Sequence, residues 1–199
     1  MGYIKNEIKS YIKENGGKKK AMKAAQEWFE EGKKKKAEKG VQVTRTRFEP
    51  GKIYVFEYMP QGIKTLPWFD ANPVVLALDE ADKNDVGINL NLLPVQVKED
   101  LLEIVYETYS GEIKMASTSP SAKGQKMLSI TWEIAKKFLQ EEGYDFALRQ
   151  YIPNLKMNQA VVSYKNWCKI ILCDLAQLEN INYLELRKMF ENHLKNKNI

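Results

Sequence analysis

The chain has 199 residues, of which 44% are hydrophobic and 11% aromatic, and it carries 31 basic and 26 acidic side chains. This composition can form a buried core within one domain of ordinary size, which argues against a wholly disordered chain. Its apolar runs are only of strand length, and the N-terminus lacks the apolar stretch of a signal peptide, so we expect no contact with a membrane.

The positive charge is concentrated in the first quarter of the sequence. Residues 1–50 carry 14 Lys and Arg against 7 Asp and Glu, a net charge of +7, whereas the other 149 residues carry 17 against 19, a net charge of −2. Such asymmetry is typical of a segment that contacts nucleic acid or an acidic protein surface.

The N-terminal segment is predicted to form two helices. Apolar residues in 3–14 recur at helical spacing, and Asn15-Gly16-Gly17 provides a stop signal. A second helix is predicted from about Lys19 to Glu31, with Gly32 ending it. Neither helix has enough apolar surface to be stable alone, so each needs a partner in this chain or in another molecule. We treat residues 1–40 as a lysine-rich helical arm.

From Val41 the pattern changes to the period of two that is typical of strands. Strands are predicted at four places separated by short connections: 41–48, 52–58, 73–78 and 86–92. Short strands with tight connections favour a small antiparallel sheet or barrel over about residues 41–93.

The remainder is predicted to be mainly helical. Helices are expected at 97–109 and 126–142, after Ser163, and from about Asn182 to Leu194, with a loop at 110–125. The stretches 147–153 and 160–162 are ambiguous. The fold class is therefore α+β, with a body of residues 41–199 that divides into a β-unit (41–94) and a mainly helical part (95–199).

The sequence offers little catalytic apparatus. It has no glycine-rich phosphate loop, no zinc-protease motif and no nucleophile elbow. The single histidine, His193, lies in a lysine-rich tail, where a solvated helix end explains it. Cys168 and Cys173 would point to different sides of a helix and are interpreted as buried free thiols. We therefore expect no enzyme activity, no metal and no cofactor.

Acidic residues present one alternative to this view. Asp79, Glu80, Asp82 and Asp85 cluster after the third predicted strand, and a magnesium-dependent nuclease could use such carboxylates. A solvated turn is the commoner reason for such a cluster. For Asp70, capping of a tight turn before Asn72-Pro73 is the preferred interpretation.

The basic residues allow three interpretations: a solvated face, contacts with the phosphates of DNA or RNA, or docking on an acidic protein. Phosphate contacts by lysine would be insensitive to sequence and would weaken steeply with salt. The candidate binding residues are Lys18, Lys19, Lys20, Lys33, Lys34, Lys35, Lys36, Lys39, Arg45 and Arg47.

Three strand-region segments, PGKIYVFEYMP (50–60), LPWFDANPVVLAL (66–78) and GINLNLLP (87–94), carry a distinctive pattern. They resemble a family of small proteins of large tailed bacteriophages, described as virion components or as proteins at the ends of packaged DNA. RQYIPNLKMNQAVVSYKNW (149–167) resembles the second half of that family. The resemblance covers roughly residues 48–194 and leaves the lysine-rich arm outside.

The chain departs from this family pattern at two places. Trp68-Phe69 replaces a tyrosine pair, and Asn91 replaces a histidine, so any polar contact between those positions is in question. The prolines around Trp68, Phe69 and Asp70 fix an extended path, which favours a rigid loop displayed towards a partner.

Two hypotheses follow for the function. The first is a non-enzymatic structural protein of a tailed-phage particle, in the connector, neck or baseplate. Its partners would be other virion proteins or copies of itself. The alternative is a DNA-binding protein at packaged DNA ends that uses the basic arm. Either implies synthesis in the host cytoplasm and a final location in the virion.

Overall fold

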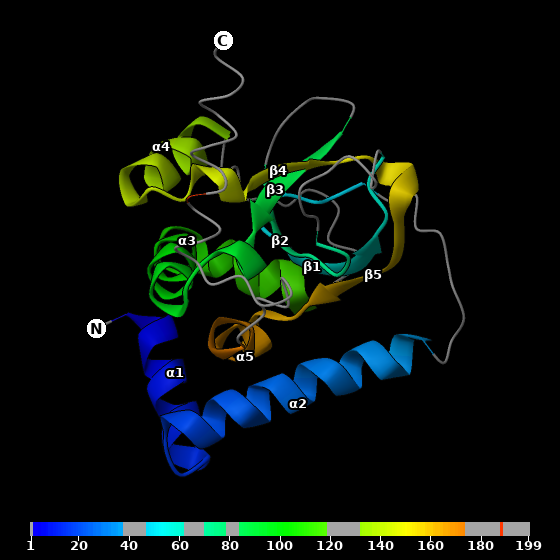
Figure 1. The fold of residues 1–199 in the computed structure, drawn as a ribbon. Coiled ribbons are helices and arrows are strands. Elements are labelled where there is room, and N and C mark those ends of the chain that lie inside the picture. Colours follow the sequence, from blue (N-terminus) through cyan, green and yellow to red (C-terminus); the bar gives the residue numbers. More distant parts are fainter. Residues whose placement is uncertain are drawn as a thin grey trace.

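The computed structural model describes residues 2–37, 47–61, 70–78, 84–118, 132–173 and 188 (Figure 1). The helices are α1 (Tyr3–Glu14), α2 (Lys18–Ala37), α3 (Val95–Thr118), α4 (Trp132–Glu142) and α5 (Trp167–Leu172). The strands are β1 (Ile53–Tyr58), β2 (Val74–Ala77), β3 (Asp85–Asn89), β4 (Leu148–Tyr151) and β5 (Lys156–Val162). Single 3-10 turns occupy Leu90–Leu92, Asp145–Ala147, Pro153–Leu155 and Tyr164–Asn166.

The five strands form one antiparallel sheet in the order β4-β3-β2-β1-β5. The α+β prediction is confirmed. Strands β4 and β5 are its two edges and do not pair with each other. Within the described residues the sheet is therefore open and does not close into a barrel. Of the stretches that were ambiguous in the sequence, 147–153 contains β4 and 160–162 forms the end of β5.

Alternation along the strands gives the sheet two different faces. One row of residues runs across all five strands in register and is apolar throughout: Val162, Ile53, Leu76, Ile88 and Leu148. This row belongs to the main core, which it forms together with side chains of the helices. We call this side the helix-covered face.

The opposite side, called here the aromatic face, carries the alternate side chains of each strand. A second, smaller apolar cluster lies there, and no helix contributes to it within the described residues. Its members are Tyr54, Phe56, Val75, Ala77 and Tyr151, with Phe48 and Tyr58 packed against them. The sheet is therefore buried on both sides, which explains why β1 and β2 are apolar at nearly every position.

A bulge bends edge strand β5 where it pairs with β1. The register shifts between Val55 and Glu57, and Asn158 adopts a positive φ of 52°. Asparagine tolerates this left-handed conformation better than most residues, and its side chain donates a hydrogen bond to Glu57 Oε1 at 2.9 Å. The extra residue increases the local twist at this edge.

The two N-terminal helices find their partner within the chain. Ile4 and Ile8 of α1 and Ala21, Ala25 and Phe29 of α2 are buried in the main core. Helix α1 packs on α3 and α5, and α2 packs on α5, so the pair forms a helical hairpin against the body. The predicted division into an arm and a body at residue 40 stays a prediction.

Two element boundaries differ from those predicted. Helix α2 continues past Gly32 to Ala37, because a glycine inside a helix costs only about 1 kcal/mol and the flanking lysines are good helix formers. Helix α3 extends to Thr118, into the stretch 110–125 that was expected to be a loop. The small and polar residues of 110–118 weaken a helical pattern without preventing it.

Gly87 provides a test of the packing between strands. A Cβ atom there would lie 2.2 Å from Val75 Cγ1 and 2.7 Å from the Leu76 carbonyl oxygen. Gly87→Ala should therefore lower the free energy of unfolding by about 1–3 kcal/mol, measured by urea denaturation. Gly32→Ala is the matched control, because nothing lies within 4 Å of its Cβ, and it should leave stability unchanged or raise it by up to about 1 kcal/mol. Equal effects at the two sites would contradict this account.

Candidate nucleic-acid interface

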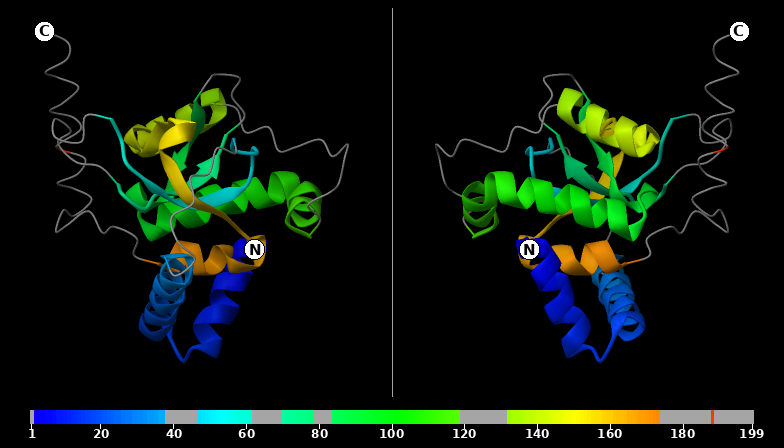
Figure 2. Two further views of the ribbon diagram at one scale, coloured as in Figure 1. Left: turned by 90° about the vertical axis from the view of Figure 1, so that its right-hand side faces the viewer. Right: turned by 90° about the vertical axis from the view of Figure 1, so that its left-hand side faces the viewer.

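The turn between α1 and α2 is flanked by four exposed lysines. Figure 2 shows the helical hairpin projecting from the body, with this turn at its far end. Lys13 at the end of α1 and Lys18, Lys19 and Lys20 at the start of α2 are all exposed. These four lysines are called the basic tip. The structure thus brings together one of the two predicted lysine clusters with a lysine of the preceding helix.

The geometry of the turn is fixed by its glycines. Gly16 has a φ of +70°, the Gly17 amide donates to the Ile12 carbonyl at 2.9 Å, and the Gly16 amide donates to the Lys13 carbonyl at 3.1 Å. This pair of bonds is a Schellman motif, which ends α1 and starts α2 within a few residues. The turn therefore leaves only four residues between Lys13, at the end of α1, and Lys18, at the start of α2.

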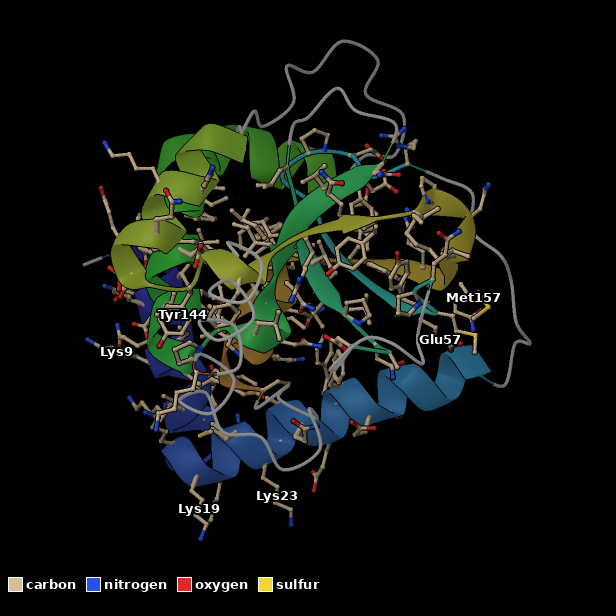
Figure 3. All side chains as sticks on the ribbon, turned by 45° about the horizontal axis from the view of Figure 1, so that its top comes forward. Lys9, Lys19, Lys23, Glu57, Tyr144 and Met157 are labelled. Atoms are coloured by element: carbon tan, nitrogen blue, oxygen red, sulfur yellow. The ribbon has the colours of Figure 1, made fainter. Side chains whose placement is uncertain are left out.

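The first turn of α2 is electrostatically unusual. It contains no acidic residue, although helices favour Asp or Glu where their amide groups point outward and the dipole is positive. Lys18, Lys19 and Lys20 occupy these positions instead, and the ion pairs within the described part of the chain do not include them. Lys19, like Lys9 and Lys23, points away from the body (Figure 3). This arrangement leaves a positive potential suited to an anion.

The structure does not describe the side chains of most of the other candidate binding residues. Lys33, Lys34, Lys35 and Lys36 lie in the C-terminal part of α2, and their side chains are outside the described set. Lys39, Arg45, Trp68 and Phe69 also lie outside the described residues. Their predicted roles stay predictions.

Arg47, one of the candidate phosphate ligands, makes several contacts within the chain, and its role in binding phosphate stays a prediction. Its Nε donates to Asp85 Oδ1 at 2.8 Å, and its Nη2 donates to the Asn84 carbonyl at 2.8 Å. The Phe48 amide donates to the same carboxylate oxygen at 2.9 Å. Asp85 therefore fastens residues 47–48 to the start of β3, and the charge of Arg47 is used within the fold.

The second oxygen of Asp85 is bound by a buried lysine. Lys156 Nζ donates to Asp85 Oδ2, and both side chains are almost fully inaccessible to solvent. The same ammonium lies 4.1 Å from the centre of the Phe48 ring. Burial lowers the pKa of Lys156, and the Asp85 carboxylate opposes that shift. Since Asp85 is held by two cations, it is a structural residue in this geometry and not part of a solvated acidic turn.

A polar cluster lies at the end of the aromatic face. Asp70 Oδ1 accepts the Asn72 amide at 3.0 Å, which is the predicted turn cap. Its Oδ2 accepts Asn89 Nδ2 at 3.0 Å and Asn91 Nδ2 at 2.7 Å. The carboxylate thus points inward, and a partner-facing role for this loop stays a prediction. Asn91 does make a polar contact, although a histidine stands there in the family pattern.

The segments that carry the family pattern converge in this region. Asp70 and Asn72 come from one segment, Asn89 and Asn91 from the next, and Arg149 lies close enough for its charge to act on Asp70. Burial lowers the pKa of Arg149 and raises that of Asp70. Asn89, Lys156 and Arg149 were not predicted as site residues; only the alternation of the asparagines along GINLNLLP indicated a shared face.

Among the residues that the structure describes, no three His, Cys, Asp or Glu side chains are grouped to hold a metal ion. Asp79 and Asp82, the other carboxylates of the nuclease hypothesis, lie outside that set. Cys168 and Cys173 are buried free thiols, as predicted. No described helix has the length and apolar character needed to span a bilayer.

Comparison with known proteins decides the family. A family model described as the phage T4 terminal DNA protecting protein matches residues 2–188. The chain belongs to this family. The curated proteins and the solved structures gave no match.

Membership changes two expectations from the sequence. The match begins at residue 2, so the hairpin of α1 and α2 lies inside the family region and not outside it as the resemblance implied. The family is one of phage proteins associated with DNA ends, which supports the DNA-end hypothesis better than the connector or baseplate hypothesis.

The polar cluster predicts an unusual titration. The raised pKa of Asp70 means that the folded chain takes up this proton at higher pH than the unfolded chain. Its contribution to stability is fully present below the unfolded pKa and is lost as the pH rises through the folded pKa. Asp100 is the internal control, because hydrogen bonds from Gln96 and Lys5 lower its pKa. Carboxyl NMR titration should show the two midpoints on opposite sides of 3.8; a midpoint for Asp70 at or below this value would refute the assignment.

Removal of the Asp85 carboxylate should leave the Lys156 ammonium buried without its acidic partner and so destabilise the fold. Asp85→Ala is expected to lower the free energy of unfolding by about 3–5 kcal/mol, and Lys156→Met in the same chain should recover part of that loss. Asp145→Ala, at an exposed site, should change stability by less than about 0.5 kcal/mol. Thermal or urea unfolding provides the measurement, and purely additive effects of the two substitutions would argue against the pair.

Proposed function

We propose that this chain binds the ends of phage DNA through the basic tip and acts by occupying them, without chemical turnover. The observation that carries the proposal is the basic tip itself, four exposed lysines on a projecting turn within the region matched by the family. The family is described as one that protects terminal DNA. DNA is accordingly the proposed partner.

The chemistry of the tip supports contacts with phosphate groups. Lysine ammonium groups act as mobile point charges, which suit phosphates better than base edges. The free amide groups at the start of α2 add positive potential in the same place. Three lysines beside that helix end are unfavourable for the isolated protein, and a bound polyanion would remove the repulsion.

The proposal also accounts for the lack of apparent reaction chemistry. A protein that shields a DNA end needs affinity and residence time, and it does not need a nucleophile, an acid or a base. Protection would follow from mass action, since an end that is occupied is inaccessible to other proteins. The uneven charge of the chain would help by steering the basic segment towards DNA, and residues 51–199, with a net charge of −2, would not compete for it.

Replacement of Lys18, Lys19 and Lys20 by Gln tests the proposal. If each contacts a phosphate, the slope of log K against log salt should become less steep by about 2.7. Affinity for a blunt linear duplex should then fall by roughly 500-fold at 0.1 M salt, provided that the affinity at 1 M salt is unchanged. The measurement is fluorescence anisotropy over a range of salt concentrations.

Two controls define the result. Lys136→Gln with Lys137→Gln removes exposed charge from α4 and should leave the slope unchanged. A closed-circular competitor of the same sequence should displace the labelled duplex less well than a linear one. Equal competition by both forms would show that the protein binds DNA but not its ends, and an unchanged slope in the Lys18–Lys20 variant would remove the tip from the proposal.

A further inference from the structure

The N-terminus of α1 has no cap of its own. The N-cap residue is Gly2, which has no side chain to accept a hydrogen bond, and the first turn contains no acidic residue. The acceptor comes from another helix. Glu103 of α3, which is almost fully buried, accepts the Ile4 amide at Oε1 over 3.3 Å and the Lys5 amide at Oε2 over 2.8 Å.

Gly2 is required for this contact. A Cβ atom at position 2 would lie 2.0 Å from both Cδ and Oε1 of Glu103, well inside van der Waals contact. Any larger residue would have to push the carboxylate away from the amides that it caps. The side chain of Glu103 is buried and hydrogen-bonded, so it has little freedom to move aside.

Two further contacts fix the same turn of α1 on α3. Lys5 Nζ lies 3.1 Å from Asp100 Oδ1, and the rings of Tyr3 and Tyr106 stack with their centres 4.1 Å apart. Asp100, Glu103 and Tyr106 recur at intervals of three and so lie along one side of α3. The ion pair is about two-fifths exposed on each side, so it contributes little, and the buried Glu103 is the main charged contact.

We infer that Glu103 is a positioning residue for DNA binding, holding α1 folded so that Lys13 stays beside Lys18, Lys19 and Lys20. The inference rests on the proposed function of the basic tip. A helix of 12 residues is marginal when isolated, so α1 depends on its docking. If the docking is lost, Lys13 and the rest of α1 separate from the start of α2, while the lysines of α2 remain.

This role predicts a specific pattern of effects. If α1 stays undocked when Glu103→Ala binds DNA, the phosphate contact of Lys13 is lost, and the Kd at 0.1 M salt rises about eightfold, provided that the affinity at 1 M salt is unchanged. The salt slope should decrease by about 0.9, the contribution of one lost phosphate contact, whereas general destabilisation of a protein that remains folded leaves the slope unchanged. Glu103→Gln retains one acceptor oxygen and should give an intermediate Kd.

Gly2→Ala and Glu103→Ala form a double-mutant cycle. Each alone should speed hydrogen exchange of the amides of residues 3–14 and weaken DNA binding. In the double variant the added methyl group finds the space left by the carboxylate, so Gly2→Ala should have no further effect. The full chain should carry its purification tag at the C-terminus, so that Gly2 keeps its surroundings. Glu141→Ala, an exposed residue of α4, is the control substitution.

The outcomes separate this inference from the function on which it rests. Strong non-additivity, with a lower salt slope in both single variants, supports it. Additive effects, or faster exchange of α1 with unchanged Kd and slope, would overturn it while DNA binding by the wild type stands. If the wild type fails to bind DNA ends, the proposed function fails, and the exchange data alone then report whether Glu103 docks α1. Should Glu103→Ala fail to fold, Gly2→Ala and Glu103→Gln carry the same comparison.

Discussion

Helix α3 carries two buried charges of opposite sign, and each is satisfied by the end of another helix. Glu103 meets the N-terminus of α1, where the helix dipole is positive, and Lys98 Nζ donates to the Cys173 carbonyl at the end of α5, where it is negative, over 2.8 Å. The N-terminal and C-terminal parts of the described chain are thereby fixed to one helix. Glu103 fixes α1, and Lys98 fixes α5, on which α2 packs. These two charges therefore help to position the projecting hairpin.

The centre of the sheet could be predicted from sequence, and its edges could not. Strands β1, β2 and β3 are near-continuous apolar or alternating runs with turn signals between them, so local pattern is sufficient. Strand β4 contains the polar pair Arg149 and Gln150, and β5 begins with Lys156, Met157 and Asn158. These become strand residues only because partners far away in sequence supply hydrogen bonds and charges, above all Asp85 for Lys156. No window of local sequence contains that information.

The same limit applies to the surroundings of the candidate binding residues. A run of lysines signals a basic surface by itself, and the exposed cluster at the start of α2 was therefore found. Arg47 has the same charge but is paired with Asp85, which identity alone does not reveal. The role of Glu103 is harder to predict, because its hydrogen-bond donors are the backbone amides of Ile4 and Lys5. Every residue except proline has such an amide, so the sequence does not indicate the partner. Only the paired observation of a capless helix start and a buried carboxylate identifies it.

The basic tip lowers the stability of the hairpin, and the proposed function would explain why the chain keeps it. Helix α1 ends in a well-formed Schellman turn, so the chain is able to satisfy helix ends where nothing else is required. At the adjoining start of α2 it places lysines where acidic or capping residues would stabilise the helix. The hairpin compensates elsewhere, through Ile4, Ile8 and Phe29 in the core and through Glu103 at the opposite end of α1. Burial and capping in the hairpin thus offset the destabilisation caused by unpaired lysines at its turn. A surface that binds a polyanion requires such compensation, because its cations have no acidic partners in the free protein.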